Sequence, residues 1–295
     1  MAASTENSPA AVRGKGIFPP EYSYGDDELL VPEVFQGHLP TTLEKSAVRL
    51  AVNPHLGDVQ NKERLRMTTS LRYGLTENWE TSMAGDLYFS HGHGVIRSFD
   101  SKGVSTLRFG MKVNLGEPLL AGWKMGAGAD YIFPNGRPPA ELTDGLRHFI
   151  PYVTVSHRLE SHPDLRIFFG FRYEDITHTS VPGEFADNAF HDSSTGITGG
   201  WVLDRKNWHY TFETSYDTTR LLRGPAKDVY TARPGVIWEI PSRRHPQTKS
   251  NWVVGVALNG TFGRPGSISL GASFRLRYSR DIKDLFRPTS TAPAR

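Results

Sequence analysis

The sequence predicts an all-β fold, an antiparallel transmembrane β-barrel of about twelve strands with short periplasmic turns and long extracellular loops. Three observations support this prediction. Apolar and polar residues alternate with period two over most of the 295 residues, and the connections are short and long in turn. All six tryptophans lie close to connections that strand order places at the short-turn end. Together these observations favour a barrel with a membrane interface at each end over a soluble sheet.

The expected strands follow one another with little sign of helical periodicity. Each is a segment of roughly 10 to 15 residues in which every second residue is apolar, and turn-rich sequence separates it from the next. Many strands of similar length are typical of a sandwich or a barrel. The predicted strands are residues 45–54, 63–75, 79–90, 103–116, 121–133, 147–160, 164–177, 191–204, 207–219, 228–240, 250–262 and 266–280.

One side of each expected strand is apolar and the other carries charges. In the second strand, Leu71 and Tyr73 alternate with Arg72, and later strands repeat this arrangement. A dry sandwich core could not hold the charges, so in a soluble sandwich or a lipocalin-like protein they would form the solvated outside. In a membrane barrel they would line a wet lumen, and the apolar side would face lipid.

The tryptophans favour the membrane barrel. All six have the apolar parity, and all lie within a few residues of a connection at the short-turn end, whereas a core would scatter them along the strands. Indole prefers the boundary between hydrocarbon and water, so we expect these residues to form a membrane girdle at one depth. The girdle residues are Trp79, Trp123, Trp201, Trp208, Trp238 and Trp252.

The connections assign the two ends of the barrel. TEN, GEP, ESHP and DRKN are short, and they are interleaved with longer stretches such as SHGHGVIRSFDSKG and ITHTSVPGEFADNAF. Short turns are periplasmic in outer-membrane barrels, and an even strand number places both termini at that end. IPSRRHPQTKSN is the exception, because strand order assigns this rather long stretch to the short-turn end.

The chain divides into three predicted parts. Residues 1–43 form an extended, Pro-rich segment with four prolines between Phe18 and Pro40, and this segment is too apolar for a simple linker. We expect it to act as a plug or a docking arm, and a protein partner would bind here. Residues 44–280 form the barrel, and residues 281–295 form a C-terminal tail.

The composition excludes several classes of protein. No stretch of about 18 consecutive apolar residues is present, which excludes a transmembrane helix. The net charge is only +3 without a basic block, so nucleic-acid binding has no support, and the absence of cysteine excludes disulfides and thiolate metal sites. We expect a location in the bacterial outer membrane, although MAASTENSPAAVRGKG lacks the apolar core of a signal peptide.

The last expected strand, SISLGASFRLRY, carries a family-level pattern. Ser269, Gly271, Phe274 and Leu276 resemble the assembly signal of bacterial outer-membrane barrels, although here a tail follows the strand. The resemblance implies that the barrel assembly machinery is a partner. The apolar exterior would contact outer-membrane lipid and lipopolysaccharide.

The hairpin RYGLTENWE resembles those of the putative outer-membrane transporters grouped under the meta-pathway of phenol degradation, and the plan of the 45–280 span is similar. This resemblance implies an uptake or channel role for small solutes, aromatic ones among them.

The inward parity is richer in cations than in anions, which would favour anions in a narrow pore. The alternative is that these charges pair across strands and fill the lumen. The predicted lumen and selectivity residues are Arg64, Arg66, Arg72, Glu80, Asp86, Arg108, Lys112, Lys124, Asp130, Arg172, Glu174, Glu213, Arg233, Glu239 and Arg275.

Catalysis has one candidate pair, His191 and Ser193 on the lipid-facing parity, which resemble the His-x-Ser arrangement of outer-membrane phospholipase A and lipid A deacylases. An orienting acid of matching parity is missing on the next strand, so a polar rim is the favoured interpretation. His91 and His93 lack further clustered ligands, and we expect no metal and no cofactor.

The sequence therefore predicts a pore or uptake channel for small solutes with a positively biased lumen. Two alternatives stay open. One is a lipid-modifying hydrolase that uses His191 and Ser193, and the other is a non-conducting structural or partner-binding barrel, plugged by side chains or by the segment before Leu43.

Overall fold

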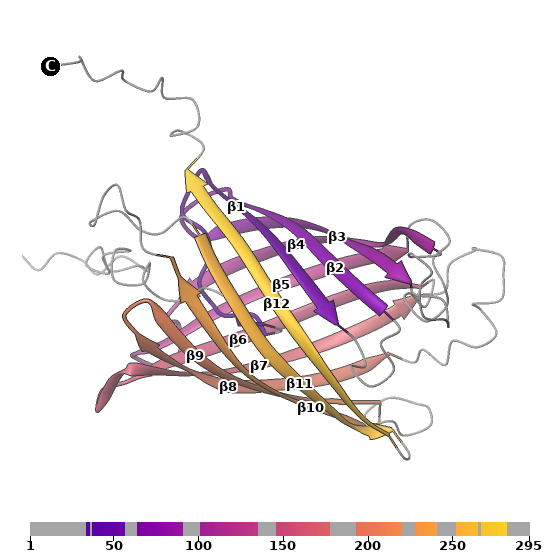
Figure 1. Ribbon diagram of the computed structural model, residues 1–295. Helices are drawn as coiled ribbons and strands as arrows, with labels where there is room; N and C mark the ends of the chain where they lie inside the picture. Colours follow the sequence, from indigo (N-terminus) through magenta and orange to yellow (C-terminus); the bar gives the residue numbers. More distant parts are fainter. Residues whose placement is uncertain are drawn as a thin grey trace, which may run out of the picture.

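The computed structural model describes residues 34–35, 37–56, 64–90, 101–134, 146–177, 193–219, 228–240, 252–264 and 267–281. Twelve β-strands make up most of this part of the chain (Figure 1). They are β1 Ala47–Leu56, β2 Arg64–Gly74, β3 Trp79–Ser90, β4 Ser101–Gly116, β5 Trp123–Pro134, β6 Arg147–Leu159, β7 His162–Thr177, β8 Ser194–Arg205, β9 Trp208–Thr218, β10 Asp228–Glu239, β11 Trp252–Arg264 and β12 Ser267–Asp281.

The sheet closes on itself. Each strand pairs antiparallel with its neighbour in sequence, and β1 also pairs with β12 along a seam that places Ala47 opposite Asp281. Closure gives every strand a partner on both sides, which is the condition for placing β-structure in lipid. The predicted fold, an antiparallel barrel of about twelve strands, is confirmed.

The strands lie within a few residues of their predicted positions, because the two-residue alternation ends where turn residues begin. Two connections at the short-turn end are only residues 160–161 and 206–207. The strict alternation of short and long connections fails twice. Residues 240–251 form a long connection at the short-turn end, and residues 265–266 form a short one between β11 and β12 at the opposite end. Within the described part, no helix is long and apolar enough to span a membrane.

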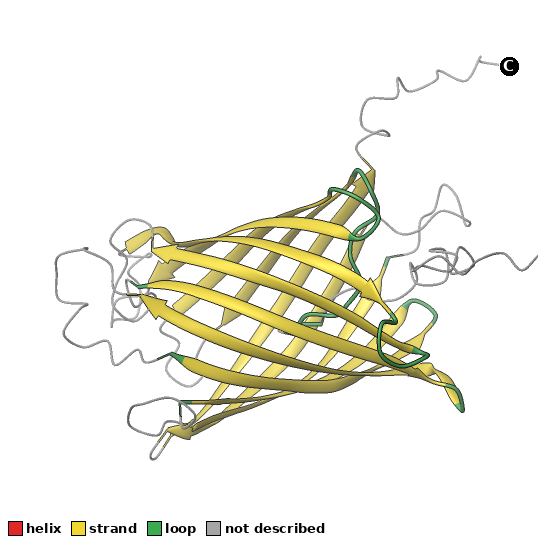
Figure 2. Ribbon diagram, turned by 180° about the vertical axis from the view of Figure 1, so that it is seen from behind, coloured by secondary structure: helices red, strands yellow, loops and turns green. Residues whose placement is uncertain are grey.

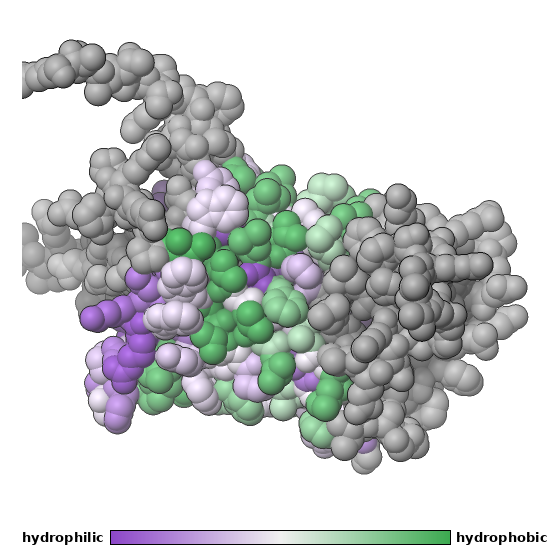
Figure 3. Space-filling model, in the orientation of Figure 1, coloured by the Kyte–Doolittle hydropathy of each residue, from purple (hydrophilic) through white to green (hydrophobic). Residues whose placement is uncertain are grey.

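The outer surface of the barrel wall is apolar. Large side chains such as Leu71, Phe109 and Phe171 point outward and are about half exposed, and in the view of Figure 3 apolar residues gather over the middle of the wall. Hydrophilic residues gather where the β6–β7 and β8–β9 turns lie. A soluble protein rarely exposes so continuous an apolar surface, whereas a barrel in lipid requires one.

The described residues directly ahead of β1 run inside the barrel. Residues 34–43, of which residue 36 lies outside the described part, are called the lumen strap below. Figure 2 shows this segment as a green trace within the ring of strands. It joins β1 through a bend in which the Ser46 N–H donates to the Gly74 carbonyl at 2.8 Å, at the short-turn end.

Candidate functional site

The C-terminal half of the lumen strap is fastened to β3 and β5. The Leu43 N–H donates to Glu80 Oε2 at 2.8 Å, which ties the strap to the beginning of β3. Farther along, Pro40 passes so close to β5 that a Cβ on Gly126 would lie 2.9 Å from the Pro40 Cα. The close approach explains why β5 carries a glycine facing the lumen here.

His38 fixes the middle of the strap against β5 and β6. Its ring stacks on Tyr152 with centroids 4.0 Å apart and an interplanar angle of 6°. Its Nε2 lies 3.6 Å from Asp130 Oδ2, and its carbonyl accepts the Thr154 hydroxyl at 2.6 Å. Three wall residues therefore hold one strap residue at mid-lumen.

The N-terminal half of the strap is held through its backbone. The carboxylate of Glu213 accepts the N–H groups of Phe35 and Gly37 at 2.5 and 2.9 Å. Arg275 Nη2 donates to the Val34 and Phe35 carbonyls at 2.9 and 3.3 Å, and its guanidinium lies 5.1 Å from the centroid of the Phe35 ring. Glu213 and Arg275 of the wall thus form hydrogen bonds with strap backbone groups that would otherwise be buried without partners.

Apolar side chains of the wall cover the same segment. Val34 and Leu39 are buried in a cluster with two inward-facing residues, Phe168 and Val202. Phe35 packs against a second pair, Ile237 and Val253. These four wall residues break the rule that the inward parity is polar. They are the signal in the sequence that could have indicated an apolar occupant of the lumen, and the prediction did not use them.

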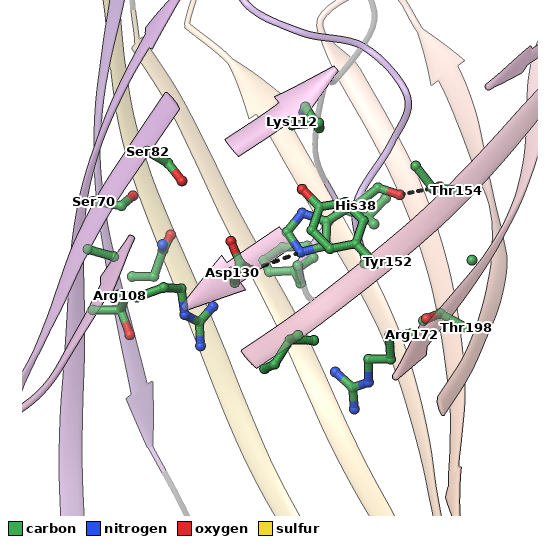
Figure 4. A pocket seen from close by; sticks show the side chains of 18 of the residues that line it. His38, Ser70, Ser82, Arg108, Lys112, Asp130, Tyr152, Thr154, Arg172 and Thr198 are labelled. Atoms are coloured by element: carbon green, nitrogen blue, oxygen red, sulfur yellow. Dashed lines mark hydrogen bonds and ion pairs between the residues drawn. The ribbon is translucent and has the colours of Figure 1, made fainter. Parts of the chain in front are cut away.

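A cavity of about 410 Å³ lies against the strap (Figure 4). The strap contributes Val34, Phe35, Gly37 and His38, and ten of the twelve strands contribute the rest, so this space is the lumen itself at the mid-height of the wall. Six cations and two carboxylates line it: Arg72, Arg108, Lys112, Arg172, Arg233, Arg275, Glu80 and Asp130.

Several of these cations are neutralised by neighbours. Arg72 Nη1 lies 2.9 Å from Glu80 Oε1, and Lys112 Nζ lies 3.6 Å from the same oxygen. Arg172 donates to Asp217 Oδ1 at 2.6 Å. The described residues around the cavity therefore include more cations than carboxylates, and some of these charges pair across strands.

Two polar clusters lie away from the cavity. Toward the long-loop end, Glu174 Oε1 lies 2.8 Å from His148 Nδ1. At the short-turn end, the fully buried His209 has its Nδ1 2.6 Å from Asp204 Oδ1 and its Nε2 3.8 Å from Glu239 Oε1. The His209 cluster was not predicted, since His209 and Asp204 meet only through the β8–β9 register.

The predicted lumen residues divide into three groups. Eight line the cavity, as named above. Five others lie outside it: Asp86, which accepts the Thr68 and Thr106 hydroxyls, with Lys124, Glu174, Glu213 and Glu239. Arg64 and Arg66 belong to β2, but their side chains lie outside the described part.

The six tryptophans have the outward parity at the short-turn end of their strands. Trp208 and Trp238 face one another across β9 and β10, with ring centroids 5.7 Å apart. Trp123 stacks on His157 at 4.9 Å, and Trp252 lies beside Tyr278 at the same distance. The aromatic rings therefore gather where a membrane interface would lie.

The catalytic pair is only partly described. Ser193 Oγ donates to Asp175 Oδ1 at 3.2 Å, so an acid of the lipid-facing parity does lie beside it, on the preceding strand. His191 lies outside the described residues, as do His91 and His93. In a triad the acid orients the histidine rather than binding the serine, so this contact does not complete one. No group of metal-ligating side chains occurs among the described residues.

The last-strand pattern is only partly visible. Phe274 and Leu276 of β12 point outward and are exposed, whereas the side chain of Ser269 and the tail from residue 282 lie outside the described part, as do residues 1–33.

The closed twelve-stranded sheet and its apolar exterior define the class of this protein, the outer-membrane β-barrels. An outer-membrane channel from Pseudomonas putida F1 has a similar structure, with a TM-score of 0.59 at 13% identity over 84% of this chain and 99% of that one. The NanC porin gives a TM-score of 0.50 at 11% identity over 79% of this chain and 98% of that one. At these identities the likeness shows the fold alone. No family model matches the chain, and no curated protein is similar to it in sequence.

Proposed function

We propose that the protein is a channel of the bacterial outer membrane for small solutes, with a positively biased lumen that the lumen strap gates. The observation that carries this proposal is the cavity of about 410 Å³ inside a closed barrel, lined by polar groups from ten strands. A structural barrel has no need of such a space, because lumen side chains can fill a small barrel completely.

The charge of the lining supports a preference for anions. The cavity carries six cations and two carboxylates, and cationic linings lower the barrier for anions in narrow pores. Pairing of Arg72 and Arg172 with carboxylates reduces this bias but leaves Arg108, which has no ion pair among the residues that the structure describes.

The strap supplies the gate. It crosses from β3 to the strands around Glu213, and in this position it blocks part of the lumen. Backbone hydrogen bonds hold it, and these can exchange with water when the strap leaves. We therefore place the passage of solute in a state in which the strap has moved.

Planar-bilayer recordings test the channel. We expect rare openings in the wild type, a higher open probability when the strap is weakened, and a reversal potential in a KCl gradient that shows anion preference. Silence from correctly inserted wild-type protein and from strap-weakened variants would favour the non-conducting barrel instead.

The chemical class of the solute is a further part of the proposal. The resemblance to transporters of phenol degradation stays a prediction, and it supports small aromatic molecules as solutes. Two of the similar solved structures are a porin and a channel by name, which is consistent with a conducting role.

The outer surface, the last strand and the N-terminal segment each suggest a binding partner. We propose that the apolar exterior contacts lipid and lipopolysaccharide, that the barrel assembly machinery recognises Ser269, Gly271, Phe274 and Leu276, and that a protein partner binds ahead of the strap. Pull-down of the assembly machinery by wild type but not by Phe274→Ala tests the second of these.

Hydrolysis of lipid remains the second candidate, and the hydrogen bond between Ser193 and Asp175 is the observation that bears on it. Phospholipid hydrolysis by wild type, lost in Ser193→Ala and in His191→Ala, would establish it. Equal hydrolysis by Ser193→Ala and the wild type would remove it.

A further inference from the structure

Arg108 of β4 presents its guanidinium to the cavity. Among the described residues it makes no hydrogen bond and no ion pair, although it lines the cavity. Its register partners are Ala84 of β3 and Ile132 of β5, neither of which can accept a hydrogen bond through its side chain. Two carboxylates lie two register positions from it. Asp86 accepts the Thr68 and Thr106 hydroxyls, and Asp130, which is within electrostatic range of Arg108, is engaged by His38. A partly buried guanidinium whose donors have no hydrogen-bond partner among the described residues is a site for an anion.

The cavity also presents an apolar surface to whatever Arg108 would hold. The stacked rings of His38 and Tyr152 stand at its centre in Figure 4, and Ile150 and Phe35 line it as well. A simple inorganic ion would leave this surface without contact. The combination suits a molecule with an anionic end and a flat or apolar body.

Arg172 adds a second cation on the far side of the rings. In Figure 4 the Arg108 and Arg172 side chains extend into the same space from β4 and β7. Arg172 uses Nε and Nη2 to bind one oxygen of Asp217, at 3.2 and 2.6 Å, so it attracts an anion more weakly than Arg108 does. The asymmetry makes Arg108 the anchor.

We propose that this cavity binds a small organic carboxylate, with the carboxylate on the Arg108 guanidinium and the body on the His38–Tyr152 rings and Ile150. The proposal rests on the proposed function, since it names the class of solute that the lumen accepts. The volume of about 410 Å³ lies in the range of small-molecule sites and admits a compound the size of benzoate.

Calorimetric titration of the detergent-solubilised, full-length protein at low ionic strength tests the site. Benzoate is the probe, and benzamide, of the same shape without the charge, is its control. We expect benzoate to bind and benzamide to bind at least tenfold more weakly. Arg108→Gln should weaken benzoate binding at least tenfold, and Arg108→Lys should fall between, because lysine keeps the charge without the two-pronged geometry.

Arg205→Gln is the matched charge control. Arg205 pairs with Asp164 at 2.7 Å on the exposed short-turn rim, outside the lumen, so its loss should leave binding unchanged. Each variant must first show slower gel migration on boiling, as a folded barrel does. Failure of folded wild type to bind benzoate, equal binding of benzamide, or equal binding by Arg108→Gln would each overturn the proposal. Because binding is measured without conduction, a silent bilayer would remove the channel and leave this site standing.

Discussion

The carboxylate of Glu213 in β9 accepts the N–H of Phe35 at 2.5 Å across 178 positions of sequence. It also accepts the N–H of Gly37, and it is only 2% exposed. One wall residue therefore holds two backbone groups of the strap, and the strap in turn covers a carboxylate that would otherwise face the open lumen. The position of the strap and the burial of Glu213 therefore depend on the same carboxylate.

Glu213→Gln should loosen the strap. The amide keeps the shape but loses the charge, and hydrogen bonds to charged groups contribute about 1.5–3 kcal/mol each. Losing about 1.4 kcal/mol shifts the strap equilibrium about tenfold, so we expect a similar rise in open probability in planar bilayers. Glu117→Gln is the control, because Glu117 accepts the Gly122 N–H on the exposed β4–β5 turn. An unchanged open probability in Glu213→Gln would argue against Glu213 as the holder of the strap.

Gly126→Ala should displace the strap without altering any charge. Its new methyl group would lie 2.9 Å from the Pro40 Cα, and backbone cannot yield as a flexible side chain does. Gly170→Ala is the control, also facing the lumen, where the new methyl would meet neighbours only at 3.5 Å and beyond. We expect single-channel recordings to show more frequent opening for Gly126→Ala alone. Equal behaviour of the two variants would mean that the strap does not limit conduction.

A single cysteine can report on the strap, because the chain contains none. Leu39 is fully buried in the lumen, so Leu39→Cys should react slowly with a water-soluble maleimide. The exposed Ser161 lies on a turn, and Ser161→Cys should react at once. Adding Gly126→Ala should speed the labelling of Leu39→Cys about tenfold, by the overpacking cost of about 1–3 kcal/mol. Fast labelling of Leu39→Cys without Gly126→Ala would place the strap outside the lumen.

Trp208→Ala should destabilise the barrel in lipid. Trp208 stacks on Trp238 with centroids 5.7 Å apart, and an aromatic pair contributes about 0.5–1.5 kcal/mol beyond its buried area. We expect a loss of about 1–2 kcal/mol in the free energy of unfolding, measured by urea titration in vesicles. Thr214→Ala, at an outward, exposed position of the same strand, should be neutral. Equal stability of both variants would contradict a girdle role for Trp208.

The barrel could be predicted because its rules are local. A strand that separates lipid from a polar lumen must alternate apolar and polar residues. The residue types of Leu71 and Arg72 therefore predict which face of the strand each occupies, whatever the strand pairs with. The inward position of Arg108 and Glu80 follows from the same parity. Closure of β1 on β12 follows from the absence of any edge that lipid could tolerate.

The contents of the lumen could not be predicted in this way. The strap has no period, and its contacts with Glu213, Arg275 and Tyr152 join residues far apart in sequence through side-chain geometry alone. Parity placed Glu213 inside but could not say that it binds backbone. The inward Phe168 and Ile237 were the available sign of an apolar occupant.

The bend at Ser46 joins the strap covalently to β1. A strap that swings out thus stays within a few residues' reach of the opening, at an effective concentration of the order of millimolar set by the short tether. Its return is a unimolecular step whose rate does not depend on how much protein is in the membrane. Each barrel is therefore closed by its own strap, and diluting the protein in the membrane does not leave the barrel open.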